Sequence, residues 1–280
     1  MRTAKTVLTV IQERGKQKKP IERVYKLLFN RELYLNAYAK LYPNNGAMTK
    51  GVTNETVDGM SIQKIDRMIE ILREEKYQWK PARREYIKKK NGKKRPLGIP
   101  VWGDKVLQEV MRQILEAYYE PQFSEHSHGF RPNRGCHTAL QEIQVWKGTR
   151  WFIEGDISQY FDTIDHKILL EILARNIHDG RFIRLVSNML EAGYLEEWKF
   201  KQTISGVPQG GVISPILANI YLNEFDNWIE EVLIPKYTKG KRQKSNPEYN
   251  KLTAEIQKLR KEGDAKTCLL YTSPSPRDTR

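Results

Sequence analysis

The sequence predicts an α+β fold in which several helices accompany small antiparallel sheets. Three observations support this class. Apolar residues recur at spacings of three and four in several segments, as on one face of a helix. Asn91-Gly92 separates two short strand-like runs, as in a tight hairpin, and residues 151–165 read as strand, turn and helix. With 280 residues, 39% of them hydrophobic, the chain can bury one large core or two smaller ones.

The N-terminal part is predicted to be helical. Apolar spacing from Pro20 toward Leu41 indicates one helix, which the turn-forming run Pro43–Gly46 ends. Ser61 is then placed to cap a second helix, because its hydroxyl can accept a hydrogen bond from a first-turn amide. The apolar stripe of that helix consists of Ile62, Ile65, Ile69 and Leu72. Both patterns indicate packing and no chemistry.

A basic hairpin and a long helix are expected next. Nine of the sixteen residues from Lys80 to Arg95 are Lys or Arg, with Asn91-Gly92 as the turn. A solvated hairpin that only touches nucleic-acid phosphates is one reading of this run. Asp104 is then predicted to cap a helix that continues to about Tyr119, with Pro121 just beyond its end.

The run from Trp151 to His166 is predicted to be a short apolar strand that presents Asp156 at its end, followed by a turn and a helix. Asp165 is placed to cap that helix. A single aspartate after a strand is often only a turn or capping residue. On spacing alone that reading of Asp156 would be preferred, and Phe161 could likewise be an ordinary core residue.

A glycine-rich stretch, Ser205-Gly-Val-Pro-Gln-Gly-Gly-Val-Ile-Ser-Pro215, precedes another predicted helix. Ser214 and Pro215 suit its cap and first position. The glycines allow the backbone to come close to a ligand, and the alternative is an ordinary Gly-Pro turn before a helix. Residues 236–244 hold five basic residues, and Asn246-Pro247 begins a charged amphipathic helix that ends near Gly263.

Taken together, these strings resemble motifs of the bacterial group II intron reverse transcriptase and maturase family. The run Trp151–His166 resembles motif A of the polymerase palm, and Ser205–Pro215 resembles motif B. The basic run Tyr86–Pro100 and the run Gly129–His137 resemble two fingers motifs. Met48–Met60 resembles the N-terminal motif of group II intron and related enzymes. The resemblance covers about residues 20–267 and implies a fingers and partial palm fold without a thumb.

The resemblance also implies a division of the chain. The expected segments are an N-terminal helical segment (1–60), fingers (61–150), a partial palm (151–235), a basic helical insertion (236–267) and a foreign tail (268–280). The tail changes abruptly to Ser and Pro without periodicity and resembles translated adapter sequence. The Tyr-x-Asp-Asp signature of the family does not occur in the 280 residues, so we expect a fragment that ends before that motif.

The resemblance implies catalytic and metal-binding roles at the end of the motif A strand. Asp156 is the expected catalytic carboxylate and a ligand of Mg2+, together with the backbone carbonyl of Ile157. Two Mg2+ ions are expected in the intact enzyme, because template-directed polymerisation uses paired divalent ions and oxygen ligands suit magnesium. Phe161, five residues later, corresponds to the steric gate that disfavours a 2′-hydroxyl, which favours dNTPs over ribonucleotides.

Nucleotide and template contacts follow from the same resemblance. Lys89 and Arg95 correspond to the fingers residues that bind the triphosphate, and their cationic groups suit phosphate oxygens. Gln209 is the expected contact to the incoming dNTP. Template and RNA contacts are implied for Arg131, Arg134, Gly210 and Gly211.

Charge and cysteine content limit the other classes. Forty-eight Lys and Arg against 34 Asp and Glu give a net charge of +14, which favours a nucleic-acid partner. No apolar run reaches the roughly 20 residues needed to span a bilayer, so no membrane partner is expected and a cytoplasmic location follows. Two cysteines make no disulfide framework. A zinc site at His126, His128, Cys136 and His137 is the less favoured reading, because the spacing fits no closed pattern.

The function expected from the resemblance is RNA-directed DNA polymerisation, with RNA template, intron RNA, DNA primer and dNTPs as partners. In the full-length protein a maturase role in binding intron RNA accompanies it. The alternative is a non-catalytic RNA-binding splicing protein, which this chain would be in practice because one carboxylate hardly organises two metal ions. Relatives acting in CRISPR or defence systems stay open, and the sequence does not reveal an oligomeric state.

Overall fold

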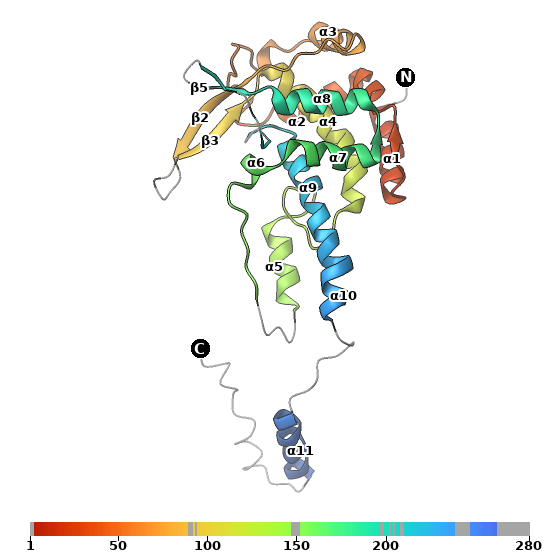
Figure 1. Cartoon of the computed structure of the whole chain (residues 1–280), viewed down its shortest axis with the longest axis vertical. Coiled ribbons are helices and arrows are strands. Elements are labelled where there is room, and N and C mark those ends of the chain that lie inside the picture. Colours follow the sequence, from red (N-terminus) through yellow and green to blue (C-terminus); the bar gives the residue numbers. More distant parts are fainter. Residues whose placement is uncertain are drawn as a thin grey trace. The chain divides into compact units, whose positions relative to one another are not determined.

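The computed structural model is built from two compact units, Met1–Trp228 and Ile229–Arg280. Figure 1 shows their helices and strands. The structure describes residues 3–88, 92, 94–146, 152–196, 199–201, 203, 205–207, 210–238 and 247–261. Helices accompany small sheets in the first unit, which confirms the α+β class. The five expected segments remain a prediction.

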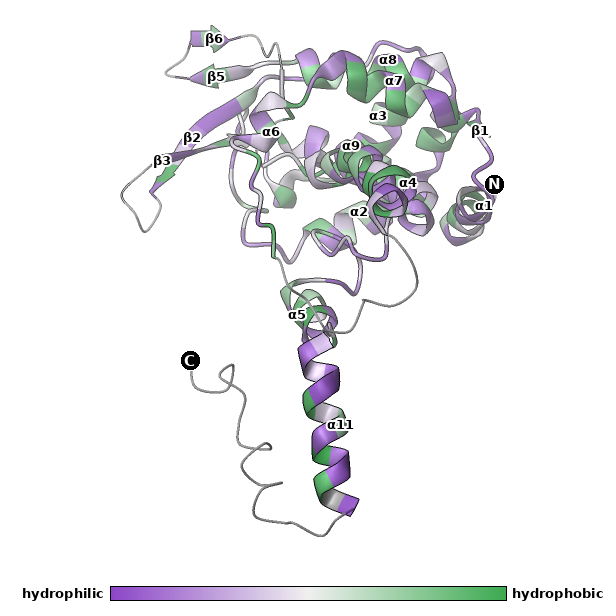
Figure 2. Ribbon diagram, turned by 60° about the horizontal axis from the view of Figure 1, so that its bottom comes forward, coloured by the Kyte–Doolittle hydropathy of each residue, from purple (hydrophilic) through white to green (hydrophobic). Residues whose placement is uncertain are grey.

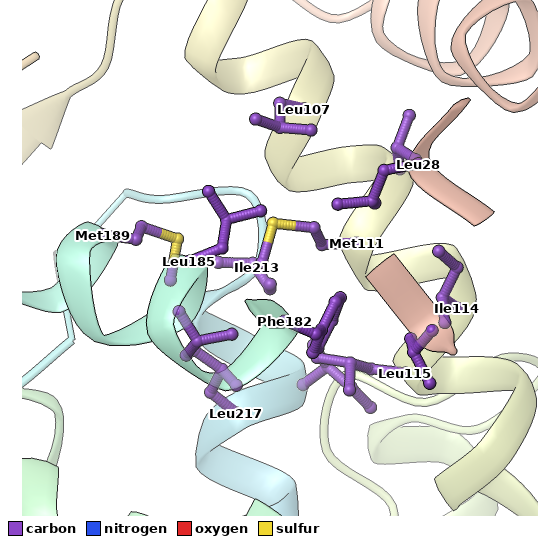
Figure 3. Packing of buried hydrophobic residues seen from close by; sticks show 14 of the residues in the cluster. Leu28, Leu107, Met111, Ile114, Leu115, Phe182, Leu185, Met189, Ile213 and Leu217 are labelled. Atoms are coloured by element: carbon purple, nitrogen blue, oxygen red, sulfur yellow. The ribbon is translucent and has the colours of Figure 1, made fainter. Parts of the chain in front are cut away.

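The first unit is organised around α4 (Trp102–Tyr119), most of whose residues are buried. Two N-terminal helices, α1 (Ala4–Lys16) and α2 (Arg31–Leu41), pack against it. Figure 3 shows Met111 and Leu115 of α4 among side chains of α8 (Gly180–Glu191), such as Phe182. Burying this many large apolar side chains stabilises the unit, at about 1.5–3 kcal/mol for each.

The N-terminal 41 residues fold differently from the single helix that we expected. Helix α1 has Thr3 as its cap and buries Ala4 and Ile11. No helix was predicted for these residues. The region from Pro20 to Leu41 divides into β1 (Ile21–Glu22), the 3-10 helix η1 (Val24–Phe29) and α2. Asn30 causes the division, because its side chain accepts a hydrogen bond from the Glu32 amide and starts α2 afresh.

Two predicted helix starts have different outcomes. Ser61 caps α3 (Ile62–Arg73) through the Lys64 amide, as predicted. The prediction for Asp104 was wrong, because α4 begins two residues earlier and its N-cap is Val101. The carboxylate of Asp104 instead accepts from the Tyr77 hydroxyl at 2.6 Å and the Lys80 amide at 3.1 Å. It therefore joins the segment after α3 to the first turn of α4.

The predicted hairpin is present in a four-stranded sheet with the order β3-β2-β5-β6. Strands β2 (Ala82–Lys88) and β3 (Lys94–Ile99) are antiparallel, as are β5 (Tyr194–Glu196) and β6 (Lys199–Lys201). Strands β2 and β5 are parallel, with Ala82 opposite Tyr194. A second parallel pair joins β1 to β4 (Ile177–His178). The sheets are therefore small but only partly antiparallel.

Short helices connect these elements. Asp165 caps α7 (His166–Asn176) through the Ile168 amide, as predicted, and α8 packs against α7. The further elements of this unit are η2 (Val57–Gly59), η3 (Glu120–Gln122), α5 (Cys136–Gln144), α6 (Tyr160–Thr163) and α9 (Ser214–Trp228). Figure 2 shows the mixed hydropathy of these helices, which is typical of elements buried on one face only.

The second unit contains the π-helix η4 (Ile229–Leu233), α10 (Ile234–Tyr237) and α11 (Pro247–Lys261). Helix α11 begins at the predicted proline, and Figure 2 shows that it is largely hydrophilic. The predicted foreign tail lies outside the described residues. No helix in the described part of the chain is long and apolar enough to cross a membrane.

Candidate functional site

The turn after Asp156 and the glycine-rich segment lie against each other. The Val207 amide donates to the Phe161 carbonyl at 2.7 Å, and the Gly206 amide donates to the Ile164 carbonyl at 2.8 Å. The Ser205 hydroxyl donates to the Asp162 carbonyl at 3.1 Å. These backbone contacts join the motif A turn to the start of motif B, although about forty residues separate them in the sequence.

Gly206 permits this close approach. Its φ is +89°, and a Cβ atom there would lie 2.7 Å from the Asp162 Cα and from the Phe161 carbonyl oxygen. A side chain would therefore strain the backbone and collide with it. The sequence predicted a close approach at these glycines, but toward a ligand. In the structure the neighbour of Gly206 is the chain's own backbone.

Two side chains hold the ends of the glycine-rich segment. The Nε2 atom of His166 lies 2.6 Å from the Gly206 carbonyl oxygen. At the other end, the side-chain oxygen of Gln108, which is buried in α4, accepts from the Val212 amide at 2.9 Å. Sequence reasoning missed both contacts. For Gln108 the available signal was a pair of polar residues, Gln108 and Glu109, between the apolar pairs Val106-Leu107 and Val110-Met111.

The same segment also touches the fingers hairpin. Gly210 has a φ of +104°, and a Cβ atom there would lie 2.6 Å from the Leu97 Cδ1 and 2.7 Å from the Gly98 carbonyl oxygen of β3. Arg95 is exposed two residues before Leu97, so both project from the same face of the strand. Arg95 and the glycine-rich segment are thereby brought into one region. Lys89 and Gln209 lie outside the described residues.

Phe161 is half-buried at the motif A turn. Its ring meets the ring of Phe130 edge-on at 6.4 Å and that of Tyr160 at 5.7 Å. The Tyr160 hydroxyl donates to the Ala218 carbonyl of α9 at 2.8 Å, and burial raises its pKa. The ring of Phe161 thus contacts two aromatic rings, of which Phe130 is itself 71% exposed. The role of Phe161 in selecting a sugar stays a prediction.

The segment that carries Asp156 differs from the prediction. Residues 152–157 form no strand, and their side chains are exposed, with Ile153 93% accessible. A strand needs a neighbour to pair with its backbone, and the described residues supply none here. Asp156 and Ile157 therefore lie on an exposed segment that precedes the Phe161 turn. The structure positions that turn, while the metal role of both residues remains a prediction.

The two arginines assigned to RNA are engaged within the protein. The side chain of Arg131 is 4% exposed, forms an ion pair with Glu120 at 2.9 Å and donates to the Ser127 carbonyl at 2.8 Å. Arg134 donates to the Glu125 carbonyl. In this conformation both guanidinium groups hold the loop before α5 together. Their contacts to a template stay a prediction, and the geometry gives Arg131 a positioning role.

The histidines of the same loop form a hydrogen-bonded cluster. His126 and His128 both bond Glu142 of α5, with 2.5 Å and 2.8 Å between nitrogen and oxygen, and these bonds lower the pKa of Glu142. His128 also contacts the Thr138 hydroxyl at 2.8 Å. No group of three or more His, Cys, Asp or Glu residues suited to a metal ion occurs among the described residues. The cluster fastens α5 to the loop.

Comparison with known proteins decides the family. A family model described as "Reverse transcriptase (RNA-dependent DNA polymerase)" matches residues 87–242, more than half of the chain. The chain belongs to the reverse transcriptase family. The match contains β3, the motif A turn and the glycine-rich segment that the structure brings together. Members of this family generally use a divalent metal ion.

Two relatives of the chain are named as intron proteins. The group II intron-encoded protein LtrA of Lactococcus lactis subsp. cremoris is 47% identical over 239 residues, which cover 85% of this chain and 40% of that protein. An uncharacterized 91 kDa protein in a cob intron of Schizosaccharomyces pombe is 47% identical over 237 residues, or 82% of this chain and 29% of that protein. The chain thus spans less than half the length of these two relatives.

A solved structure supports the fold. A chain titled "Partial Cas6-RT-Cas1--Cas2 complex" has a TM-score of 0.50 and 20% sequence identity, and the match covers 74% of this chain and 35% of that one. At this identity the likeness concerns the fold alone. It agrees with the fingers and palm arrangement that the motifs predicted.

Proposed function

We propose that this chain forms the fingers and part of the palm of a group II intron-encoded RNA-directed DNA polymerase. In the complete protein these parts copy an RNA template from a DNA primer with dNTPs, and a maturase role binds intron RNA. The observation that carries the proposal is the contact of Gly206 with the Phe161 turn and of Gly210 with β3. It brings the motif A turn and β3, which are far apart in the sequence, against the glycine-rich segment.

Each motif has a proposed task in nucleotide binding. Arg95 binds the triphosphate with Lys89, because a planar guanidinium and a flexible ammonium both suit phosphate oxygens. Phe161 blocks a 2′-hydroxyl, and its edge-on neighbours limit its movement. Gln209 contacts the incoming nucleotide, while Gly210 and Gly211 let the template come close to the backbone. Catalysis then depends largely on positioning.

Asp156 and Ile157 would supply only some of the ligands of a metal site. Asp156 and the Ile157 carbonyl supply oxygen donors of the kind magnesium takes, but a single carboxylate does not fit a complete site for two Mg2+ ions. We propose that further carboxylates of the complete protein share the ions with Asp156. When bound, magnesium would activate the primer hydroxyl and neutralise charge on the triphosphate. The described chain by itself holds one part of that site.

The second proposed function is RNA binding without nucleotide addition. It is favoured by the net charge of +14 together with the absence of Tyr-x-Asp-Asp from the 280 residues. We propose that this chain binds RNA but extends no primer, and that it acts in the cytoplasm. In that case the basic surface of the chain assists the folding of intron RNA.

Primer extension on an RNA template tests both proposals. The purified 280-residue chain should bind RNA with an affinity that falls steeply with salt and should add no dNTP. A chain continued through a Tyr-x-Asp-Asp region should extend the primer. In that longer chain, Asp156→Asn should abolish extension while RNA binding persists, and Phe161→Val should admit ribonucleotides. Extension by the Asp156→Asn variant would overturn the catalytic assignment.

A further inference from the structure

A second cavity lies apart from the motif A turn and the glycine-rich segment. It is formed by the stretch from Glu55 to Met60, by α3, by the residues that follow α3, and by the start of α4. Its volume is about 500 Å³, within the range of sites that hold small organic ligands and much larger than a single phosphate requires. Asp156, Phe161 and Gly210 take no part in its wall.

The wall of this cavity is positively charged. Lys64 and Arg67 contribute from α3, and Lys76 and Lys80 contribute from the segment that follows. Two carboxylates also belong to the wall. Glu55 lies 3.8 Å from Lys64, and the oxygens of Asp104 already accept from the Tyr77 hydroxyl and the Lys80 amide. Lys76 also pairs with Glu74, at 3.0 Å. The wall still carries four cations against two carboxylates, and this excess of positive charge favours an anionic ligand.

The remainder of the wall is largely apolar and contains one unsatisfied donor. Met60, Met68 and Ile71 are half-buried there beside Trp102. Trp102 is 3% exposed, and its Nε1 has no hydrogen-bond partner in the described protein. It lies between this cavity and a smaller one beside Gly210. A buried N–H without a partner is costly, so an acceptor atom on a ligand would remove that cost.

We propose that this cavity binds one nucleotide of single-stranded RNA, as a site separate from the polymerase centre. The phosphate lies against Lys64 and Arg67, and the base and sugar lie against the methionines and Trp102. Unstacked bases of single-stranded RNA are commonly held on aromatic and apolar side chains in this way, with cations on the backbone. The inference rests on the RNA binding proposed above and adds a specific place for it.

Photocrosslinking with mapping tests the location. A short single-stranded RNA that contains 4-thiouridine is bound to the 280-residue chain and irradiated, and the crosslinked peptides are identified by mass spectrometry. Crosslinks to the peptide that contains Met60–Met68 or to the one that contains Trp102 are the expected result. A chain that binds the RNA but crosslinks only at other peptides would overturn the site.

Matched variants test the chemistry. The double variant Lys64→Gln/Arg67→Gln should weaken RNA binding by about tenfold and reduce the salt slope by about one. Lys5→Gln/Lys16→Gln removes the same charge from α1, outside this cavity, and should weaken binding less than about threefold. Trp102→Phe keeps a ring but removes the donor, and it should reduce the crosslink yield. Thermal unfolding checks that all variants remain folded.

The outcomes separate the two proposals. If the wild-type chain binds no RNA, the proposed function fails and the inference fails with it. If it binds RNA but the two double variants lose affinity equally, only the separate site is overturned, since the effect would then be general electrostatics.

Discussion

Helix α4 and the segment 152–157 are both rich in apolar residues, yet the first is the centre of the core and the second is exposed. Ile114 of α4 is fully buried, whereas Ile153 is 93% exposed. The difference lies in their neighbours, because α1, α2 and α9 pack against α4, while no described strand pairs with residues 152–157. An apolar run thus becomes a core element only where the chain supplies its partner.

The largest expected effect is a loss of stability at Ile114, in the buried helix α4. Ile114→Ala should lower the free energy of unfolding by about 3 kcal/mol, because it removes buried methyl groups and leaves a cavity. Ile153→Ala should change it by less than about 0.5 kcal/mol, because that side chain is already exposed. Denaturant unfolding of both variants measures the difference. Similar losses would show that the segment is packed in solution.

The next prediction concerns the pH dependence of stability that the buried carboxyl of Asp104 causes. Burial raises its pKa from 3.8 to about 6. As pH rises from 4 to 7, the unfolded chain gives up this proton more readily than the folded one, so ionisation costs the fold stability. Asp104→Asn removes that cost. As pH rises from 4 to 7, the free energy of unfolding of the variant should therefore increase by roughly 2–3 kcal/mol relative to that of the wild type. A pH-independent difference in unfolding free energy would contradict this.

The next effect concerns the glycine-rich segment. Gly206→Ala places a methyl group against the Asp162 backbone at a positive φ and should cost about 2 kcal/mol. Because the segment is held at several points, we expect faster hydrogen exchange at residues 205–207 before global unfolding. Gly129→Ala is the control, since nothing lies within 4 Å of its Cβ position. Equal effects of the two variants would count against the docking of motif B on motif A.

The smallest effect tests the contact from α4. Gln108→Leu leaves the Val212 amide unpaired and should cost about 1 kcal/mol, seen as faster exchange of that amide. Gln113→Leu on the same helix is the control, because the hydrogen bond from the Gln113 side chain to the Leu33 carbonyl is long, at 3.4 Å. Unchanged exchange at Val212 in Gln108→Leu would show that the helix does not hold the segment.

The sequence predicted a feature correctly where the residues that form it are close together in the chain. The caps Ser61 and Asp165 and the hairpin around Gly92 depend on residues that are adjacent in the sequence, and they are confirmed. Predictions failed where a distant partner decided the outcome. Asp104 bonds Tyr77 in place of its own helix, and Asn30 interrupts a continuous helical pattern.

The same contrast between local and distant signals holds for the candidate site. Motif strings located Phe161 and the glycines, and the structure brings them together with β3. The contacts of Gln108 and His166 could not be read from spacing, because each joins segments at least forty residues apart. The metal-binding role expected of Asp156 stays a prediction.

The parallel pairing of β2 with β5 has a consequence for how the molecule is made. Tyr194 follows its partner Ala82 by 112 positions, so during synthesis the hairpin leaves the ribosome many seconds before its neighbouring strand exists, at about 5–20 residues per second. Closing so long a loop is slow. The open edge of β2 is exposed to wrong pairing in that interval, and the charges of Arg83, Arg84 and Lys88 along it offer protection against aggregation.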